Sequence, residues 1–144
     1  MDSPLLAQAL DPSRSVVVEA CAGSGKTWLL ISRVLRLLLA GAAPAQILAI
    51  TFTRKAAQEM ASRLQQWLEQ LALMPRHEAE AFLLARGVAA NEMPIALERA
   101  PMLFELCQTA SPGITISTFH GWFLQVLQKM PLAGGIAADT AVVE

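Results

Sequence analysis

Eight residues near the amino terminus combine glycines, a lysine and a threonine at a spacing suited to binding an anion. The segment Ala20–Thr27 reads ACAGSGKT and matches the phosphate-binding pattern G-x-x-x-x-G-K-[S/T], except for alanine at the first position. Gly23 and Gly25 let the backbone curl so that several N–H groups converge on one phosphate. Lys26 would neutralise the β- and γ-phosphates of a nucleotide, and the Thr27 hydroxyl would ligate Mg²⁺.

Two elements must position this loop. The run SVVVEA at 15–20 is rich in β-branched residues and predicts a buried strand. An apolar run from Lys26 to Ala40 predicts a largely buried helix that Gly41 ends. The free N–H groups and positive dipole end of that helix add to phosphate binding. We therefore expect ATP and Mg²⁺ as cofactors, bound by Ala22, Gly23, Ser24, Gly25, Lys26 and Thr27.

Further elements follow along the chain. QILAITF at 46–52 predicts a second apolar strand, and ITIS at 114–117 predicts a third. Two strands joined through a helix favour a right-handed βαβ unit with parallel strands. Thr53 is the expected N-cap of a helix whose apolar positions recur at helical spacing. These positions are Ala57, Met60, Ala61, Leu64, Trp67, Leu68 and Leu71.

In the second half of the chain, the sequence pattern predicts helices on both sides of the third strand. Residues 76–109 indicate short helices that are broken at Gly87, Pro94 and Pro101. Residues 119–130 repeat apolar side chains at helical spacing and predict an amphipathic helix. The tryptophans lie on apolar faces and are expected in the core; they are Trp28, Trp67 and Trp122.

Composition narrows the class of protein. The 144 residues suit about one domain, and 54% hydrophobic against 16% charged residues excludes a disordered chain. A net charge of −1 argues against a protein that coats nucleic acid non-specifically. Residues 14–63, however, hold seven basic and two acidic residues, which indicates a local anion site or a mixed solvated surface.

The chain carries no signal for secretion or for a membrane. Its longest apolar stretch, 29–40, is interrupted by Arg33 and Arg36 and falls short of the ~20 residues needed to cross a bilayer. No charged and then apolar leader opens the chain. Because Cys21 and Cys107 also suit a reducing compartment, the sequence predicts a cytoplasmic protein without membrane contacts.

Three motifs together carry a family resemblance. ACAGSGKT resembles the A-x-A-G-[S/T]-G-K-T form found in superfamily 1 helicases of the UvrD/Rep type. ITFTRKAAQEM at 50–60 looks like motif Ia of that group, and STFH at 117–120 looks like its T-F-H motif. The motifs occur in the family's order and cover about 14–63 and 114–130. The Arg in TFTRKAA and the long helical stretch before TFHGWF are most similar to RecB/AddA-like helicase–nuclease proteins.

The resemblance implies an α/β fold of the RecA-like P-loop class. Residues 1–144 would then be the incomplete N-terminal portion of the first RecA-like helicase domain, with a parallel sheet and a helical insertion at about 73–110. The implied function is ATP-dependent unwinding or translocation on DNA in double-strand-break repair or recombination. The implied partners are single-stranded DNA, duplex ends, the remainder of the helicase chain and a second repair subunit.

The resemblance also assigns a DNA track. The matching positions are Thr51, Phe52, Thr53, Arg54, Thr118, Phe119 and His120. Hydroxyl and guanidinium groups suit phosphates, and aromatic rings offer bases a stacking face, so the chemistry agrees with the assignment. The alternatives are core packing for Phe52 and Phe119 and a purely structural role for His120.

Two family features are weak or absent. Gln8 is the candidate for reading adenine, although its spacing to Lys26 is short. No D-E-x-x block occurs, and none of the aspartates Asp2, Asp11 and Asp139 ends an apolar strand. Because ATP hydrolysis needs a metal-binding and a water-positioning carboxylate, we expect residues 1–144 alone to bind nucleotide without ATPase or unwinding activity. A non-catalytic nucleotide-binding or interaction module and a small P-loop kinase are the alternatives.

Overall fold

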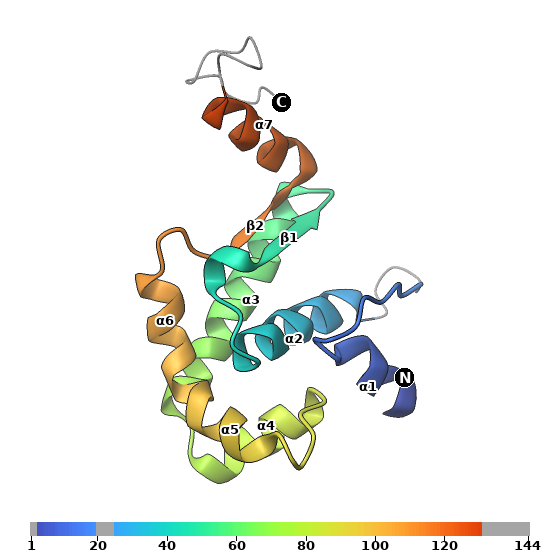
Figure 1. Ribbon diagram of the computed structural model, residues 1–144, viewed down its shortest axis with the longest axis vertical. Helices are drawn as coiled ribbons and strands as arrows, with labels where there is room; N and C mark the ends of the chain where they lie inside the picture. Colours follow the sequence, from blue (N-terminus) through green and yellow to red (C-terminus); the bar gives the residue numbers. More distant parts are fainter. Residues whose placement is uncertain (1–2, 20–24, 131–144) are drawn as a thin grey trace.

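The computed structural model describes residues 3–19 and 25–130, which form a helix-rich fold around a small parallel sheet (Figure 1). The α-helices are α1 (Ser3–Leu10), α2 (Lys26–Leu39), α3 (Arg54–Leu73), α4 (Arg76–Ala85), α5 (Met93–Arg99), α6 (Leu103–Thr109) and α7 (Phe119–Lys129). The strands are β1 (Leu48–Thr51) and β2 (Thr115–Thr118), and the 3-10 turns are η1 (Pro44–Gln46) and η2 (Ala100–Met102).

The sheet consists of two parallel strands in the described part of the chain. β1 and β2 pair in register from Leu48 opposite Thr115 to Thr51 opposite Thr118. This confirms the two strands predicted at 46–52 and 114–117, with each end shifted by one or two residues. The long helix α3 packs against both strands. The sheet is not fully buried, however, because Leu48 and Ile50 remain exposed.

The strand predicted at 15–20 is wrong for the part that is described. Residues 15–19 have no assigned secondary structure, and all of them are exposed; the Val17 side chain is 90% exposed. The expected βαβ unit between this run and 46–52 therefore does not form among these residues. β-branched side chains favour an extended backbone, but a strand also needs a hydrogen-bonded neighbour and an apolar layer to cover it.

The core lies between α2, α3 and the helices of residues 76–109. Ile31, Leu35 and Leu38 of α2 are almost completely buried, as the apolar run from Lys26 predicted. The predicted inner face of α3 is also confirmed, except that Ala61 is exposed. Residues from the later helices complete this cluster: Ala79, Leu83, Met93, Ala96, Leu97, Ala100 and Leu103.

α7 forms as predicted, yet none of its residues is buried. The helix extends beyond the carboxyl end of the sheet and contacts only the strands appreciably (Figure 1). Trp122 is consequently half-exposed and lies outside the hydrophobic core clusters, contrary to the expectation. Trp67 is buried as expected, and Trp28 is half-buried at the edge of the core.

Two helices end where a glycine adopts a left-handed backbone. Gly41, with φ 102°, follows α2, and the amides of Gly41 and Ala42 donate to the carbonyls of Leu38 and Leu37. Gly87, with φ 84°, ends α4 in the same way. Such paired bonds satisfy carbonyls that a helix end leaves open. Both glycine stops were predicted.

The two prolines expected to break helices instead help to begin them. Pro94 lies in the first turn of α5, and Pro101 lies in the first turn of η2. Proline lacks an N–H and has a fixed φ, and neither property disturbs the first turn of a helix. The helix boundaries predicted at these prolines are therefore confirmed.

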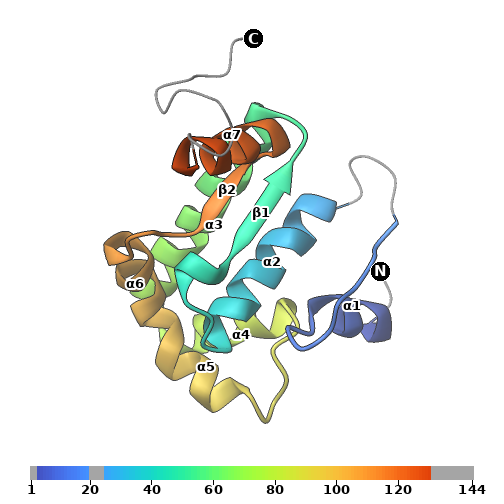
Figure 2. The same ribbon diagram turned by 45° about the horizontal axis from the view of Figure 1, so that its top comes forward.

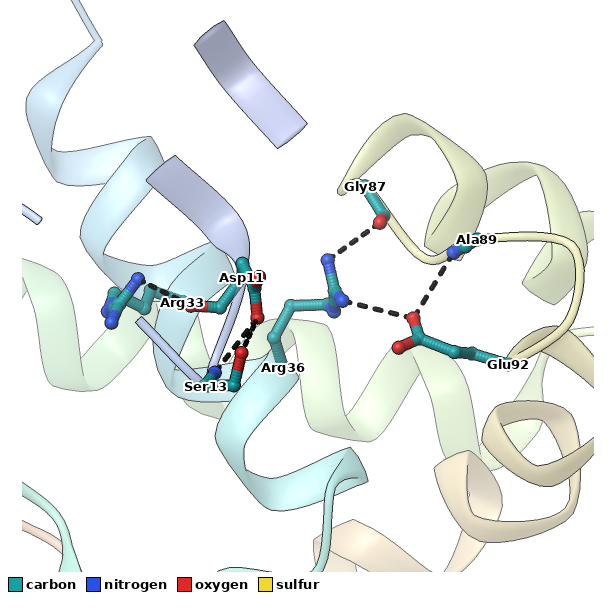
Figure 3. Close-up of polar contacts among 7 residues, drawn as sticks. All are labelled: Asp11, Ser13, Arg33, Arg36, Gly87, Ala89 and Glu92. Carbon is teal, nitrogen blue, oxygen red and sulfur yellow. Dashed lines mark hydrogen bonds and ion pairs between the residues drawn. The ribbon is translucent and has the colours of Figure 1, made fainter. Parts of the chain in front are cut away.

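Arg33 of α2 binds the segment that leads to the phosphate-loop motif. Its Nη1 donates to the carbonyls of Ala9 at 2.8 Å and Asp11 at 3.0 Å, and its Nη2 donates to the carbonyl of Arg14. The Asp11 carboxylate accepts hydrogen bonds from the amide and hydroxyl of Ser13, which lower the pKa of Asp11 (Figure 3). These bonds hold the turn that follows α1.

Arg36, one turn further along α2, binds the loop after α4. Its Nη1 donates to the Gly87 carbonyl at 2.6 Å, and its Nη2 pairs with the Glu92 carboxylate at 3.1 Å (Figure 3). Glu92 in turn accepts from the Ala89 amide at 3.3 Å. From the opposite direction, Arg99 of α5 donates to the Leu39 carbonyl at 2.8 Å. These bonds join α2 to the helices of residues 76–109.

We predict that Gly87→Ala lowers the free energy of unfolding by about 2 kcal/mol, because a left-handed backbone costs a non-glycine residue roughly 1–2 kcal/mol. An added Cβ would also lie 3.0 Å from Leu10 Cδ1 and 3.1 Å from Arg36 Nη1. Leu10 is fully buried and Arg36 is held by Glu92, so neither can move freely. Urea denaturation measures the change.

Gly41→Ala is the matched control, because φ is also positive there but the nearest atom would be 3.5 Å away. We expect Gly41→Ala to lower the free energy of unfolding by about 1 kcal/mol, because only the strain of the left-handed backbone contributes there. Equal losses in the two variants would show that crowding at Gly87 contributes nothing.

Candidate functional site

The phosphate-loop motif is described from Gly25 onward; Ala22, Gly23 and Ser24 lie outside the described residues. Gly25 is the N-cap of α2 and has φ 85°, a conformation that favours glycine. Gly25 offers no side chain to cap α2, and within the described residues a Cβ added at Gly25 would meet nothing within 4 Å. Lys26 is exposed and Thr27 is half-buried in the first turn.

The first turn of α2 differs from those of the two helices that follow the strands. Thr53 caps α3 by accepting from the Ala56 amide at 3.1 Å, and Thr118 caps α7 by accepting from the Gly121 amide at 3.1 Å. α2 has glycine at this position, and among the described residues no N-cap side chain accepts from its first-turn amides. These donors, an exposed ammonium and a hydroxyl together suit a phosphate group with its Mg²⁺.

The predicted DNA-track residues come together at the carboxyl edge of the sheet. Thr51 ends β1 and lies directly opposite Thr118, which ends β2. Phe52 and Arg54 follow the first strand, and Phe119 follows the second. The two motifs are more than 60 residues apart in the sequence, and the parallel register makes them neighbours. Ligands of open α/β sheets bind at this edge.

The aromatic side chains of this edge do not pack in the core. Phe52 is fully exposed, and Phe119 is 55% exposed. Phe119 stacks on Phe123, with ring centres 6.1 Å apart and planes 9° from parallel. The Phe119 and His120 rings are nearly perpendicular, with centres 6.0 Å apart. The core alternative for Phe52 and Phe119 is therefore wrong in this structure. Sequence reasoning omitted Phe123 from the track, although its i+4 spacing from Phe119 indicates the contact.

Polar contacts shape the turn after β1. The Thr51 hydroxyl donates to the Thr53 carbonyl at 2.9 Å, and the Thr53 hydroxyl caps α3. Both hydroxyls are thus engaged in local structure. They can still accept a further hydrogen bond, because a hydroxyl oxygen carries two lone pairs.

The exposed face of α3 continues this polar surface. A shallow hollow of about 350 Å³ runs along the helix, lined only by polar and charged side chains. The lining residues are Lys55, Gln58, Glu59, Ser62, Arg63 and Gln66. Arg63 was not singled out from the sequence, although Lys55, Glu59 and Arg63 recur at i, i+4 and i+8 on one helix face.

The phosphate-loop end of α2 and the track lie on the same side of the molecule. In Figure 2, α2 runs beside β1 in the opposite direction, so its amino-terminal end lies toward the arrowhead of β1. Residues of α2 and of the β1 region also line one groove, among them Leu30 and Val34 with Leu48 and Ile50. Gln8 is exposed on α1, and its role in reading adenine stays a prediction.

Residues 3–19 and 25–130 contain neither a membrane-spanning helix nor a cluster of metal ligands. No helix in these ranges has the length and apolarity that crossing a membrane requires. No group of three or more His, Cys, Asp or Glu side chains there is arranged to bind a metal.

Known proteins resemble the chain over most of its length. Residues 3–143 match the family described as the UvrD/REP helicase N-terminal domain. An ATP-dependent helicase/nuclease subunit of Oceanobacillus iheyensis is 37% identical over 117 residues, which is 79% of this chain and 8% of that protein. The proteins of the same name from Lactobacillus gasseri and Levilactobacillus brevis are 42% identical over 69 residues (47% of this chain) and 41% identical over 83 residues (57%), each covering 6% of the relative.

The chain therefore spans less than a tenth of the length of these relatives. The family match, in contrast, includes the phosphate-loop motif, both strands and the track residues. We conclude that the chain belongs to the UvrD/REP helicase N-terminal domain family.

Proposed function

We propose that the chain is the ATP-binding part of an ATP-dependent DNA helicase or translocase of the UvrD/Rep type. Membership of the UvrD/REP helicase N-terminal domain family is the observation that carries the proposal. The relatives named as ATP-dependent helicase/nuclease subunits support the same activity. The process that we propose for it is double-strand-break repair or recombination. The partners in this proposal are DNA, the remainder of a helicase chain and a second repair subunit.

ATP and Mg²⁺ are the proposed cofactors. Lys26 would neutralise the β- and γ-phosphates, Thr27 would ligate the metal ion, and the backbone of Ala22–Gly25 would donate N–H groups. The uncapped amino-terminal turn of α2 and the exposure of Lys26 support this arrangement. The metal supplies charge neutralisation on the phosphates when it is bound.

We further propose that the chain forms the amino-terminal portion of a RecA-like P-loop domain. The parallel β1–β2 pair and the helix that follows each strand support this assignment. The helices α4, α5 and α6 would be an insertion at about 73–110. Their internal packing against α2 and α3 supports treating them as one helical unit.

Single-stranded DNA is the proposed ligand of the carboxyl edge of the sheet. Arg54 and the threonine hydroxyls would contact phosphates, and Phe52 and Phe119 would stack on bases. The exposure of both rings and the register of Thr51 with Thr118 support this proposal. A helicase needs nucleotide and DNA on adjoining surfaces, because a change in the bound nucleotide must alter the surface that binds the DNA strand.

We predict that Lys26→Ala weakens Mg²⁺-dependent ATP binding by at least about tenfold, since one lost charge contact commonly removes about 1.4 kcal/mol or more. Titration of the 144-residue chain with a fluorescent ATP analogue measures the affinity. Lys55→Ala is the matched control, because Lys55 is also exposed in the first turn of a helix that lies outside the loop. It should bind like the wild type.

Equal affinities of the wild type and Lys26→Ala would remove Lys26 from the site. Absence of binding by the wild type would contradict the proposed nucleotide function as a whole.

We predict salt-sensitive binding of single-stranded DNA, weakened by Arg54→Ala and by Phe119→Ala. Loss of Arg54 should weaken binding equally for all DNA sequences. It should also reduce the dependence of affinity on salt concentration by about the amount that one phosphate contact contributes. Loss of Phe119 should remove stacking worth roughly 1–3 kcal/mol. Arg76→Ala is the control, because Arg76 is exposed at the start of α4. α4 and α7 lie at opposite ends of the molecule (Figure 1).

Stability of the same variants separates stacking from packing. Because Phe119 is half-exposed, Phe119→Ala should lower the free energy of unfolding by about 1 kcal/mol. The same truncation of a buried phenylalanine lowers it by ~3–5 kcal/mol. A large loss of stability, with unchanged DNA affinity per folded molecule, would assign Phe119 to structure and leave the track without its stacking ring.

A further inference from the structure

Arg86, the residue directly after α4, lies over three aromatic rings. Its Cζ is 3.3 Å from the centre of the Phe82 ring, 4.0 Å from that of Trp67 and 5.8 Å from that of Trp28. The rings also meet each other edge to face, with centres 6.4 Å apart for Trp28 and Trp67 and 5.6 Å apart for Trp67 and Phe82. We call these four side chains the Arg86 stack; it joins α2, α3 and α4.

The guanidinium is poorly compensated by polar groups. Arg86 Nη1 donates to the Phe82 carbonyl at 2.9 Å, whereas Nε is buried without a hydrogen-bond partner. Within the described ranges no carboxylate pairs with Arg86, and burial lowers its pKa to about 10. An apolar side chain of similar length would fill the same space without the cost of burying a charge. The attraction between the cation and the rings is therefore what distinguishes arginine at this position.

Trp28 connects this stack to the nucleotide site. It directly follows Thr27 and lies in the first turn of α2, where the N-cap Gly25 has no side chain to hold the backbone. Its half-buried ring packs against both hydrophobic clusters, the main core and the small cluster of Ala9, Leu10 and Leu29. Lys26 and Thr27 lie in the same helical turn as Trp28, so a shift of the indole ring would also move them.

We propose that Arg86 is a positioning residue of the nucleotide site, which it acts on by holding Trp28 against Trp67 and Phe82. The first turn of α2 is then set by α4, a helix of the 76–109 region, rather than by the loop alone. This inference rests on the proposed nucleotide-binding function. If Arg86 has this role, the helices of residues 76–109 influence ATP affinity through Trp28.

The test compares Arg86→Met with Arg86→Lys in the 144-residue chain. Arg86→Met keeps an apolar stem and removes the cation, and it should weaken Mg²⁺-dependent binding of a fluorescent ATP analogue by about tenfold. Arg86→Lys keeps a cation over the rings and should restore most of the affinity. Thermal melting of each variant shows the folded fraction, so that affinities are given per folded molecule.

Arg99→Met is the matched control. Arg99 also joins the helical region to α2, but it binds the Leu39 carbonyl at the far end of the helix. Its loss should lower stability and leave ATP affinity unchanged. Should Arg86→Met fail to fold, Phe82→Leu removes the ring nearest the guanidinium and should weaken ATP binding in the same way.

Amide hydrogen exchange gives a readout that needs no nucleotide. The Leu29 amide donates to the Gly25 carbonyl at 3.0 Å, in the first turn of α2. In Arg86→Met its protection should fall more than that of Leu38 near the other end, and in Arg99→Met the order should reverse. Uniform loss of protection along α2 in Arg86→Met would reduce Arg86 to a structural residue and overturn the inference.

The two proposals fail in different ways. ATP binding that is lost in Lys26→Ala but unchanged in Arg86→Met overturns the role of Arg86 and leaves the nucleotide site standing. A wild type that binds no ATP overturns the nucleotide site, and with it the role of Arg86 there. In that case the exchange pattern still shows whether the stack orders the first turn.

Discussion

The structure depends on how α2 is held, because this helix carries Lys26 and Thr27 at one end and supplies core residues along its length. Three guanidinium groups hold the helix by hydrogen bonds. Arg33 and Arg36 extend from α2 to neighbouring segments, and Arg99 of α5 binds the end of α2. All of them donate to backbone carbonyls of segments that do not belong to regular elements or that end a helix. A hydrogen bond from a charged donor stabilises by roughly 1.5–3 kcal/mol, and a buried carbonyl left unpaired costs a comparable amount. These bonds therefore determine where the connecting segments run.

This arrangement explains why an apolar helix contains arginines at all. Apolar side chains of α2 fill the core, but they cannot satisfy the carbonyls of the segment 9–14 or of the loop after α4. Arg36 is nearly buried and meets the half-exposed Glu92 at its outer side, so its charge is both hydrogen-bonded and paired. Arg86 lacks such a carboxylate within the described residues and relies on aromatic rings instead.

The candidate site is built from three helix beginnings with different chemistry. The α3 and α7 turns are closed by threonine caps, which hold their strand-to-helix connections in place. The α2 turn begins at a glycine, which has no side chain to accept from its donors. The capped ends present aromatic and basic side chains, and the uncapped end presents amides and an ammonium group. A polymer with bases suits the first kind of surface, and a compact polyphosphate suits the second.

Local sequence determined much of this protein. Hydrophobic spacing predicted α2, α3 and α7, glycines marked the ends of α2 and α4, and the motifs located the candidate site residues. These features follow from interactions within a few residues, such as helix hydrogen bonds, caps and left-handed turns. Only the tertiary structure decided which apolar runs are covered. The run at 15–19 and the face of α7 have the same apolar character as β1 or α3, but burial depends on neighbours that are distant in the sequence. The pairing of Thr51 with Thr118 and the meeting of Trp28, Trp67, Phe82 and Arg86 were likewise beyond prediction from spacing, because each joins segments that only packing brings together.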